Sequence, residues 1–280
     1  NDNLMKLDGL ELQDFEDLKK IIGASKSTKI VWVNGRVLKA DGTFNWSVSG
    51  AGRFFLDNIK IDHHDYLWED DFSWLSEMIA AYNEANPAKP IDSPIKYKPE
   101  EFKKASDANA PNAYTAEPFK SSFPAALAAA GYKDLNAGGK VIYPQDTHLK
   151  FGKTSVHTSL QFAPFAKVEG STNAVLSFDW FRHVQGTAKI DPVELVVVIE
   201  GDGTFENGKK VSEPLTTPQE YVENVSAQMF WTNATVKIEG ASANTKLNIV
   251  YKDCVNADGT YNWTVSGAHR YHIDNIVVTR

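Results

Sequence analysis

The spacing of apolar side chains along the chain predicts strands far more often than helices. Residues 174–182 alternate, so that Leu176, Phe178 and Trp180 share one face of an extended strand and polar residues share the other. Residues 193–199 are almost continuously apolar and β-branched, which is typical of a strand covered on both faces. Many short strands with little helix predict an all-β fold, an antiparallel β-sandwich.

Shorter segments complete this prediction. Asp258 and Gly259 form a turn signal, and they predict a hairpin between strands at 245–251 and 260–266. Further strands are expected at 140–143, 148–152, 156–162 and 225–238. Helical spacing occurs at 72–82, and a short helix is expected at 124–130, with proline near its start and Gly131 after its end.

An internal repeat is the most informative feature of the sequence. Residues 40–62 (ADGTFNWSVSGAGRFFLDNIKID) align without a gap to residues 257–279 (ADGTYNWTVSGAHRYHIDNIVVT), with 14 of 23 positions identical. Residues 63–280 are therefore expected to form one complete sandwich domain. Residues 1–62 match only the end of that module, so we expect them to be the C-terminal portion of a truncated first repeat. The alternative is a small independent domain, although about 60 residues bury little core.

Composition and charge exclude several functions. With 29 basic and 36 acidic residues the net charge is −7, which argues against nucleic acid or an anionic membrane as the main partner. No apolar run approaches the roughly 20 residues that span a bilayer. The single cysteine, Cys254, excludes an internal disulfide and a cysteine-based zinc cluster. The sequence has no nucleophile elbow and no P-loop, and the histidines lack partners at zinc spacing.

In the last strand of each copy, the apolar residues switch between odd-numbered and even-numbered positions partway along the strand. Tyr271 and Ile273 are apolar at odd numbers, whereas Ile276 and Val278 are apolar at even ones. Because side chains alternate between faces, the change predicts a bulge at Asp274-Asn275, and at Asp57-Asn58 in the first copy. A carboxylate on a bulge is a candidate metal ligand. The alternative is that Asp274 only accepts hydrogen bonds from the backbone amides of the bulge.

A run of three acidic residues, 69–71, opens the second module. Adjacent carboxylates repel one another unless water or a cation screens them, and Ca²⁺ prefers clustered oxygen ligands. The ordinary alternative is a solvated acidic turn in which Asp71 caps the following helix.

The opening stretch W-E-D-D-F-S and the closing stretch R-Y-H-I-D-N-I-V-V resemble those of galactose-binding-like jelly rolls, the β-sandwich of many carbohydrate-binding modules. More narrowly, they are similar to the tandem jelly-roll regions of secreted or surface lipoproteins from Bacteroides-type bacteria. The resemblance implies a structural calcium held by Asp71, with Asp70 or Glu69 as alternates, and by Asp274. Many such modules have a glutamate where this chain has Ser73.

Aromatic side chains are the usual platforms for sugar rings. The candidates at the opening strand or in and beside the proline-rich loops are Trp68, Trp74, Tyr97, Tyr114 and Tyr132. For each of them packing in the core is the alternative reading.

The resemblance and these residues predict a non-catalytic, extracellular carbohydrate-binding module braced by calcium. It would bind a glycan or polysaccharide at the cell surface, as an outer-membrane lipoprotein or a secreted protein with neighbouring domains. One alternative is a structural or adhesive spacer of a surface protein. Another is a β-sandwich glycoside hydrolase or polysaccharide lyase, for which Asp179, Glu194 and Glu200 are candidate carboxylates.

Overall fold

The computed structural model describes residues 65–91, 111–145, 148–185, 189–217 and 231–280, together with a few positions before residue 48. The chain divides into two units, Asn1–His63 and His64–Arg280. In the first unit, β1 (Met5–Leu7) and β2 (Leu10–Leu12) pair antiparallel. Within the described residues no helix is long and apolar enough to cross a membrane.

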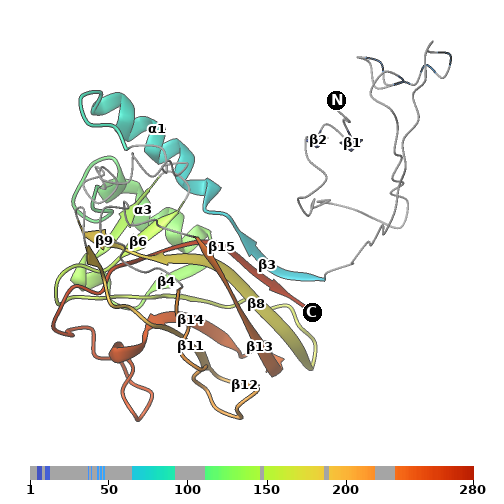
Figure 1. Cartoon of the computed structure of the whole chain (residues 1–280), viewed down its shortest axis with the longest axis vertical. Helices are drawn as coiled ribbons and strands as arrows, with labels where there is room; N and C mark the ends of the chain where they lie inside the picture. Colours follow the sequence, from blue (N-terminus) through green and yellow to red (C-terminus); the bar gives the residue numbers. More distant parts are fainter. Residues whose placement is uncertain are drawn as a thin grey trace. The chain divides into compact units, whose positions relative to one another are not determined.

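The second unit contains two large antiparallel sheets (Figure 1). The seven-stranded sheet consists of β12 (Thr204–Phe205), β13 (Thr232–Ser242), β8 (Ser171–Arg182), β15 (Tyr271–Thr279), β6 (Leu149–Phe151) and β5 (Ile142–Pro144) in that order, with β3 (Tyr66–Asp70) also paired to β15. The four-stranded sheet consists of β11 (Leu195–Glu200), β14 (Lys246–Tyr251), β7 (Leu160–Phe162) and β4 (Tyr132–Asp134) in that order. A short pair, β9 (Val184–Gln185) with β10 (Lys189–Ile190), follows β8. The predicted antiparallel sandwich is confirmed.

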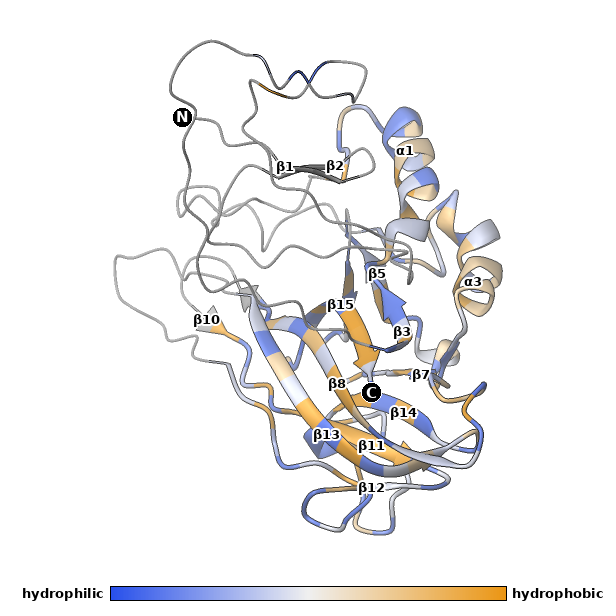
Figure 2. Cartoon of the chain, turned by 90° about the vertical axis from the view of Figure 1, so that its right-hand side faces the viewer, coloured by the Kyte–Doolittle hydropathy of each residue, from blue (hydrophilic) through white to orange (hydrophobic). Residues whose placement is uncertain are grey.

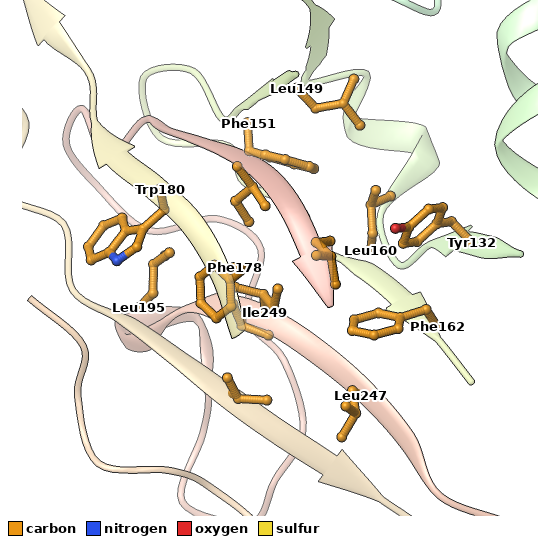
Figure 3. Packing of buried hydrophobic residues seen from close by; sticks show 14 of the residues in the cluster. Tyr132, Leu149, Phe151, Leu160, Phe162, Phe178, Trp180, Leu195, Leu247 and Ile249 are labelled. Atoms are coloured by element: carbon orange, nitrogen blue, oxygen red, sulfur yellow. The ribbon is translucent and has the colours of Figure 1, made fainter. Parts of the chain in front are cut away.

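The hydrophobic core lies between the two sheets. Leu176, Phe178 and Trp180 of β8 are fully buried, and Figure 3 shows Phe178 and Trp180 beside Leu195 and Ile249 of the smaller sheet. Strand β11 is buried from Leu195 to Ile199, as its sequence predicted. Figure 2 shows the hydropathy of successive residues changing along β8 and β13, which is the pattern of strands with one face toward the core.

Two helical segments lie near the start of the second unit. The helix predicted at 72–82 is present as η1 (Ser73–Leu75) followed by α1 (Ser76–Ala85). The helix predicted at 124–130 begins earlier, because α3 spans Phe119–Ala129 with Pro124 inside it. A proline inside a helix removes one amide hydrogen bond and crowds the carbonyl one turn earlier. The burial of Phe119, Phe123 and Leu127 at four-residue spacing offsets that cost. Short helices η2 (Ala137–Gly139) and η3 (Lys252–Cys254) lie in connections.

The predicted hairpin is only half correct. Strand β14 forms, and Gly259 makes the expected turn with a φ of +81°. Residues 260–266 form no strand, and their pairing with the preceding chain is a single bridge between Val255 and Tyr261. The segment is instead tied to another loop, since the His157 amide donates to the Trp263 carbonyl and the Ser155 amide to the Gly267 carbonyl. Hydrogen bonds to the loop at 155–157 therefore take the place of the expected strand pairing with β14.

The bulge predicted in β15 is confirmed. Asp274 pairs with Asp179 and Val277 pairs with Ser177, so β15 has one extra residue at this point. Asn275 supplies the bend with a φ of +48°. On its other edge β15 pairs with β6 before the bulge and with β3 after it. The bulge thus lies where β15 changes partner. The matching positions Asp57 and Asn58 lie outside the described residues.

Three hydrogen bonds of the repeat occur at matching positions in both units. In the second unit they run from the Asn262 amide to the Cys254 carbonyl (2.8 Å), from the Asn256 amide to the Thr260 carbonyl (2.9 Å), and from the Thr264 amide to the Asn262 side chain (3.0 Å). In the first unit they run from Asn45 to Val37 (2.7 Å), from Lys39 to Thr43 (2.9 Å) and from Ser47 to the Asn45 side chain (3.1 Å). The identical turn sequence therefore has the same bonding. That residues 1–62 are the end of a first copy stays a prediction.

Candidate functional site

The face of the seven-stranded sheet that points away from the core carries an unusual set of side chains. Tyr271 and Ile273 of β15 belong to the hydrophobic core, so His272 between them points to the opposite face. Phe181 of β8 is the cross-strand neighbour of His272. It is 1% exposed yet lies outside the core cluster between the sheets. Phe181 therefore belongs to a second, smaller cluster of buried side chains, which lies on the outer face of the seven-stranded sheet.

One row of residues crosses this face through five chain segments. His272 lies opposite Phe181 on one side and opposite Lys150 on the other, and Lys150 lies opposite Tyr143. The Phe181 and His272 rings stack with centroids 4.1 Å apart. Trp231, which directly precedes β13, packs edge to face on Phe181 with centroids 4.6 Å apart. We call Tyr143, Lys150, His272, Phe181 and Trp231 the aromatic row.

A second row lies two residues further along the same strands and is polar. Asn233, Asp179 and Asp274 are cross-strand neighbours on β13, β8 and β15. The Asp179 carboxylate accepts hydrogen bonds from the side-chain amides of Asn233 and Asn275, each at 2.9 Å. We call these four residues the polar row. Because a strand rises about 3.4 Å per residue, the two rows are about 7 Å apart.

Three histidines meet beside the aromatic row. The Nδ1 atom of His272 lies 3.1 Å from Nε2 of His148, and its Nε2 atom lies 3.1 Å from Nδ1 of His183. All three are at most 4% exposed. Burial lowers the pKa of His148 to about 3, and it lowers the pKa of His183 and His272 well below the usual value. The three rings are therefore neutral at pH 7, with His272 donating to one neighbour and accepting from the other.

Spacing along the chain does not predict this histidine cluster. Neither His148 nor His183 has a metal partner at a short spacing, and His272 is one residue of the predicted closing strand. The three positions are far apart along the chain and meet only through the pairing of β15 with β6 and β8. The alternation that predicted Tyr271 and Ile273 inside did place His272 outside.

The predicted metal ligands come together at the bulge. Strand β3 pairs with β15 so that Asp70 lies opposite Ile276 (Figure 1). The two oxygens of Asp70 accept hydrogen bonds from the Phe72 amide (2.8 Å) and from the Trp74 indole (3.2 Å). Asp71 accepts from the Ser73 amide at 3.0 Å. Both residues therefore accept hydrogen bonds within the turn before η1, but the N-cap of η1 is Phe72 and not Asp71, which the alternative reading had expected as the cap.

Asp274 is the least satisfied of these carboxylates. Its Oδ1 atom accepts from the Asn275 amide, and the hydrogen bonds among the described residues leave its second oxygen without a donor. The pKa of Asp274 is raised to about 7, mainly by burial and also by the nearby carboxylates, while the hydrogen bond from the Asn275 amide acts in the opposite direction. Across the described residues no three side chains of His, Cys, Asp or Glu converge on one metal position. Asp71 and Asp274 thus fit a cation only if backbone carbonyls supply the remaining ligands.

Four of the five aromatic residues expected to bind sugar pack in or against the hydrophobic core. Tyr132 is 4% exposed and Trp68 half-buried, and their rings meet at 5.5 Å. Trp74 packs against Phe123, and the Tyr114 hydroxyl donates to Asp134. Tyr97 lies outside the described residues. A ligand role for Trp68, Trp74, Tyr97, Tyr114 and Tyr132 stays a prediction, but packing of the described four with neighbouring rings explains their positions.

The carboxylates considered for catalysis do not share one site. Asp179 belongs to the polar row of the seven-stranded sheet. Glu200 ends β11 of the other sheet and accepts hydrogen bonds from Gln161 and Asn248 at 2.7 and 2.9 Å. Glu194 forms an exposed ion pair with Lys252 at 2.5 Å.

Comparison with known proteins found only distant likenesses. No protein-family profile and no curated protein matches the chain. The C-terminal CBM6 of LamC, a laminarinase from Zobellia galactanivorans, is 13% identical, with 47% of this chain and 80% of that chain covered and a TM-score of 0.27. The K3 cleaved adhesin domain of Lys-gingipain from Porphyromonas gingivalis is 13% identical, with 53% and 90% covered and a TM-score of 0.32. The CBM22-1 xylan-binding domain of Paenibacillus barcinonensis Xyn10C is 14% identical, with 54% and 85% covered and a TM-score of 0.29.

Proposed function

We propose that the outer face of the seven-stranded sheet binds a glycan without cleaving it. The observation that carries this proposal is the pair of adjacent rows, one rich in aromatic rings and one of amides and carboxylates, about 7 Å apart on the same face. A face of this kind acts where polysaccharides are found, so we place the protein outside the cell or on its surface.

The chemistry of a sugar matches the two rows. One face of a pyranose ring presents C–H groups, which lose contact with water when they pack on an aromatic ring. The half-buried Trp231 supplies such a ring. The hydroxyl groups around the ring both donate and accept hydrogen bonds, and the polar row offers amide donors together with carboxylate and carbonyl acceptors. Asn233 and Asn275 are exposed, and Asp179 and Asp274 are partly exposed.

The test is the replacement Trp231→Ala. We expect the affinity for the best polysaccharide of a panel to fall at least about tenfold, because a central aromatic contact often dominates binding energy. Affinity gel electrophoresis followed by calorimetry measures this. Trp263→Ala is the matched control, since Trp263 is also half-buried but stacks on Tyr261 elsewhere. Equal loss in both variants, or no binding to any polysaccharide by the wild type, contradicts the proposal.

We also propose that a calcium ion braces the sandwich at the bulge of β15, held by Asp71 and Asp274 with backbone carbonyls. The pairing of the first and last strands of the domain supports this, because it brings carboxylates of both strands to the bulge. The raised pKa of Asp274 is further support, since a cation would stabilise its ionised form. Asp70, whose two oxygens are both occupied, is left out of this ligand set.

Chelation tests the calcium proposal. An ion that binds only the folded state stabilises it by about 2.7 kcal/mol at a hundredfold excess over its dissociation constant. We therefore expect chelator to lower the melting temperature of the wild type and of an Asp258→Asn control, but not that of Asp274→Asn. Equal melting with and without chelator, in protein first verified to contain the metal, rules the brace out.

The pH dependence gives an independent readout of Asp274. Its pKa in the folded protein, about 7, is above the unfolded value of 3.8, so its contribution favours folding below pH 3.8 and is lost as the pH rises to 7. In chelator, the difference in stability between Asp274→Asn and the wild type should therefore grow from pH 4 to pH 7. Denaturant titrations at several pH values measure it. A constant difference contradicts the raised pKa.

A further inference from the structure

Among the residues that the structure describes, one positive charge on the outer face has no ion-pair partner. Lys150 is half-buried in the aromatic row, and its ammonium lies 4.1 Å from the centre of the Tyr143 ring. Among the described residues, none of the ion pairs includes Lys150. A half-buried ammonium that contacts only a ring face has lost water without gaining an anion.

The groups around Lys150 leave it cationic but unneutralised. Its cross-strand neighbour His272 is neutral, as are His148 and His183 beside it. Arg270 adds a second positive charge, and the nearby carboxylate Asp191 is bound to Arg270 at 2.8 Å. Burial and the charge of Arg270 lower the pKa of Lys150 to about 8, whereas Asp191 acts in the opposite direction. Within the described parts of β5, β15 and the segment before β11, Asp191 is thus the carboxylate that acts on Lys150, and it is bound to Arg270.

We propose that this face selects acidic glycans, with Lys150 pairing with an anionic group, a carboxylate or a sulfate, on the bound sugar. The inference rests on the proposed glycan binding and names its substrate class. Trp231 and Tyr143, the partly exposed rings of the aromatic row, supply the contact that any sugar can make. Lys150 supplies a charge that only an acidic sugar can satisfy. A charge-assisted hydrogen bond in a half-buried place is stronger than one to a neutral hydroxyl group, which gives the selectivity.

The overall charge of the protein makes a local cationic site a requirement of the inference. With a net charge of −7, the chain as a whole repels polyanions, so that binding of an acidic glycan requires a local cationic site. The polar row beside it contains two carboxylates, Asp179 and Asp274, which repel an anionic group. We therefore expect the anionic group of the sugar to lie toward Tyr143 and Lys150, and its hydroxyl groups to lie over the polar row.

The experiment compares acidic and neutral polysaccharides in calorimetry with wild type, Lys150→Gln and Trp231→Ala. Polygalacturonate and its methyl ester form one pair, and dextran sulfate and dextran form the other. We expect the wild type to bind one acidic member at least about tenfold more tightly than its neutral partner, and Lys150→Gln to lose that preference. Lys153→Gln, which removes an exposed lysine three residues away, should keep it. Thermal melting confirms that each variant is folded.

The outcomes separate the inference from the proposed function. If Trp231→Ala abolishes binding but acidic and neutral glycans bind the wild type equally, the face binds glycans and the acidic preference is overturned. If polyglutamate binds as tightly as the acidic glycans, the attraction is general for polyanions and the inference is also overturned. If no polysaccharide binds at all, the proposed function itself fails. The carboxylate and sulfate pairs distinguish the two sources of the anionic group.

The pH dependence supplies a signature that a merely structural lysine does not have. Because the pKa of Lys150 is about 8, the acidic preference should weaken as the pH rises from 7 to 9. Lys150→Arg keeps its charge throughout that range, so it should retain the preference at pH 9. An unchanged preference in the wild type between pH 7 and pH 9, or no rescue by arginine, counts against the assignment.

Discussion

At the end of the second copy of the repeat, His272 stands where the first copy has Phe55, and His269 stands where it has Gly52. Nearby positions do not change, since both copies keep the arginine before the strand and the Asp-Asn pair of the bulge. The core-facing residues Tyr271, Ile273 and Ile276 correspond to Phe54, Leu56 and Ile59, which are all apolar. The positions that shape the strand, its core-facing residues and its bulge, are thus shared, whereas His272 on the strand and His269 before it are substituted.

The difference between the copies separates the shared backbone frame from the side-chain contacts on the outer face. The repeated turn has the same three hydrogen bonds in both units, so the local frame does not depend on the substituted residues. His272, by contrast, joins His148 and His183 and lies beside Lys150. A phenylalanine in its place could stack on Phe181 but could bond to neither histidine. The contacts of His272 with the other two histidines therefore depend on a residue that the first copy does not have at this position.

Replacing a shared core residue should have the largest effect. Ile276 is 2% exposed between the sheets, and Ile276→Ala should lower the free energy of unfolding by about 3 kcal/mol through lost burial and the cavity left behind. Urea denaturation measures the loss. Val277→Ala, which changes the next residue on the opposite face, should cost less than about 1.5 kcal/mol. Similar losses in both variants would mean that the two faces are equally buried and would break the comparison.

The second prediction concerns His272→Phe, which gives the second copy the residue that the first copy has at Phe55. The three histidines have pKa values below the usual 6.5, so their contribution to stability is complete above pH 6.5 and is lost as the pH falls toward their folded values. Each group adds a slope of up to about 1.4 kcal/mol per pH unit. His272→Phe removes one of the three, and the acid sensitivity below pH 6.5 should fall by about a third.

Denaturant titrations of wild type and His272→Phe between pH 4.5 and pH 7.5 measure this slope. His269→Ala is the control, because His269 lies partly exposed and outside the cluster, with its ring nitrogens 3.2 and 3.0 Å from the Pro192 and Ser266 carbonyls. An unchanged slope in His272→Phe shows that the cluster does not titrate as three neutral rings.

The sheet frame could be predicted from sequence because it depends on local alternation. The strand around Leu176, Phe178 and Trp180, the buried strand β11 and the bulge at Asp274 each follow from the spacing of a few neighbouring residues. The sequence-based assignments were wrong where contacts between distant parts of the chain determine the local structure. Residues 260–266 bond to the loop at 155–157 rather than to β14, and α3 extends through Pro124 because its aromatic face is buried.

The candidate site could be predicted only in part for the same reason. The repeat and its parity change identified Asp274, and strand pairing then brought it near Asp70 and Asp71. The aromatic row combines residues from five separate segments, and no spacing along the chain reveals that Tyr143, Lys150 and His272 are neighbours. The sequence makes Trp68 and Trp74 candidates for sugar binding, but it cannot show that Trp68 packs on Tyr132 and Phe162.

The smallest expected effect concerns the turn that both copies share. In an exposed turn, the Asn262 side-chain oxygen accepts a hydrogen bond from the Thr264 amide at 3.0 Å. The Asn45 side-chain oxygen accepts the matching bond from the Ser47 amide at 3.1 Å. Because water replaces an exposed hydrogen bond, Asn262→Ala should cost only about 0.5–1 kcal/mol. Amide hydrogen exchange gives the sharper readout, with faster exchange at Thr264 in Asn262→Ala and at Ser47 in Asn45→Ala. Each variant should leave the other turn unchanged. If Asn45→Ala does not alter exchange at Ser47 while Asn262→Ala alters it at Thr264, the two turns share a sequence but not a stable hydrogen bond.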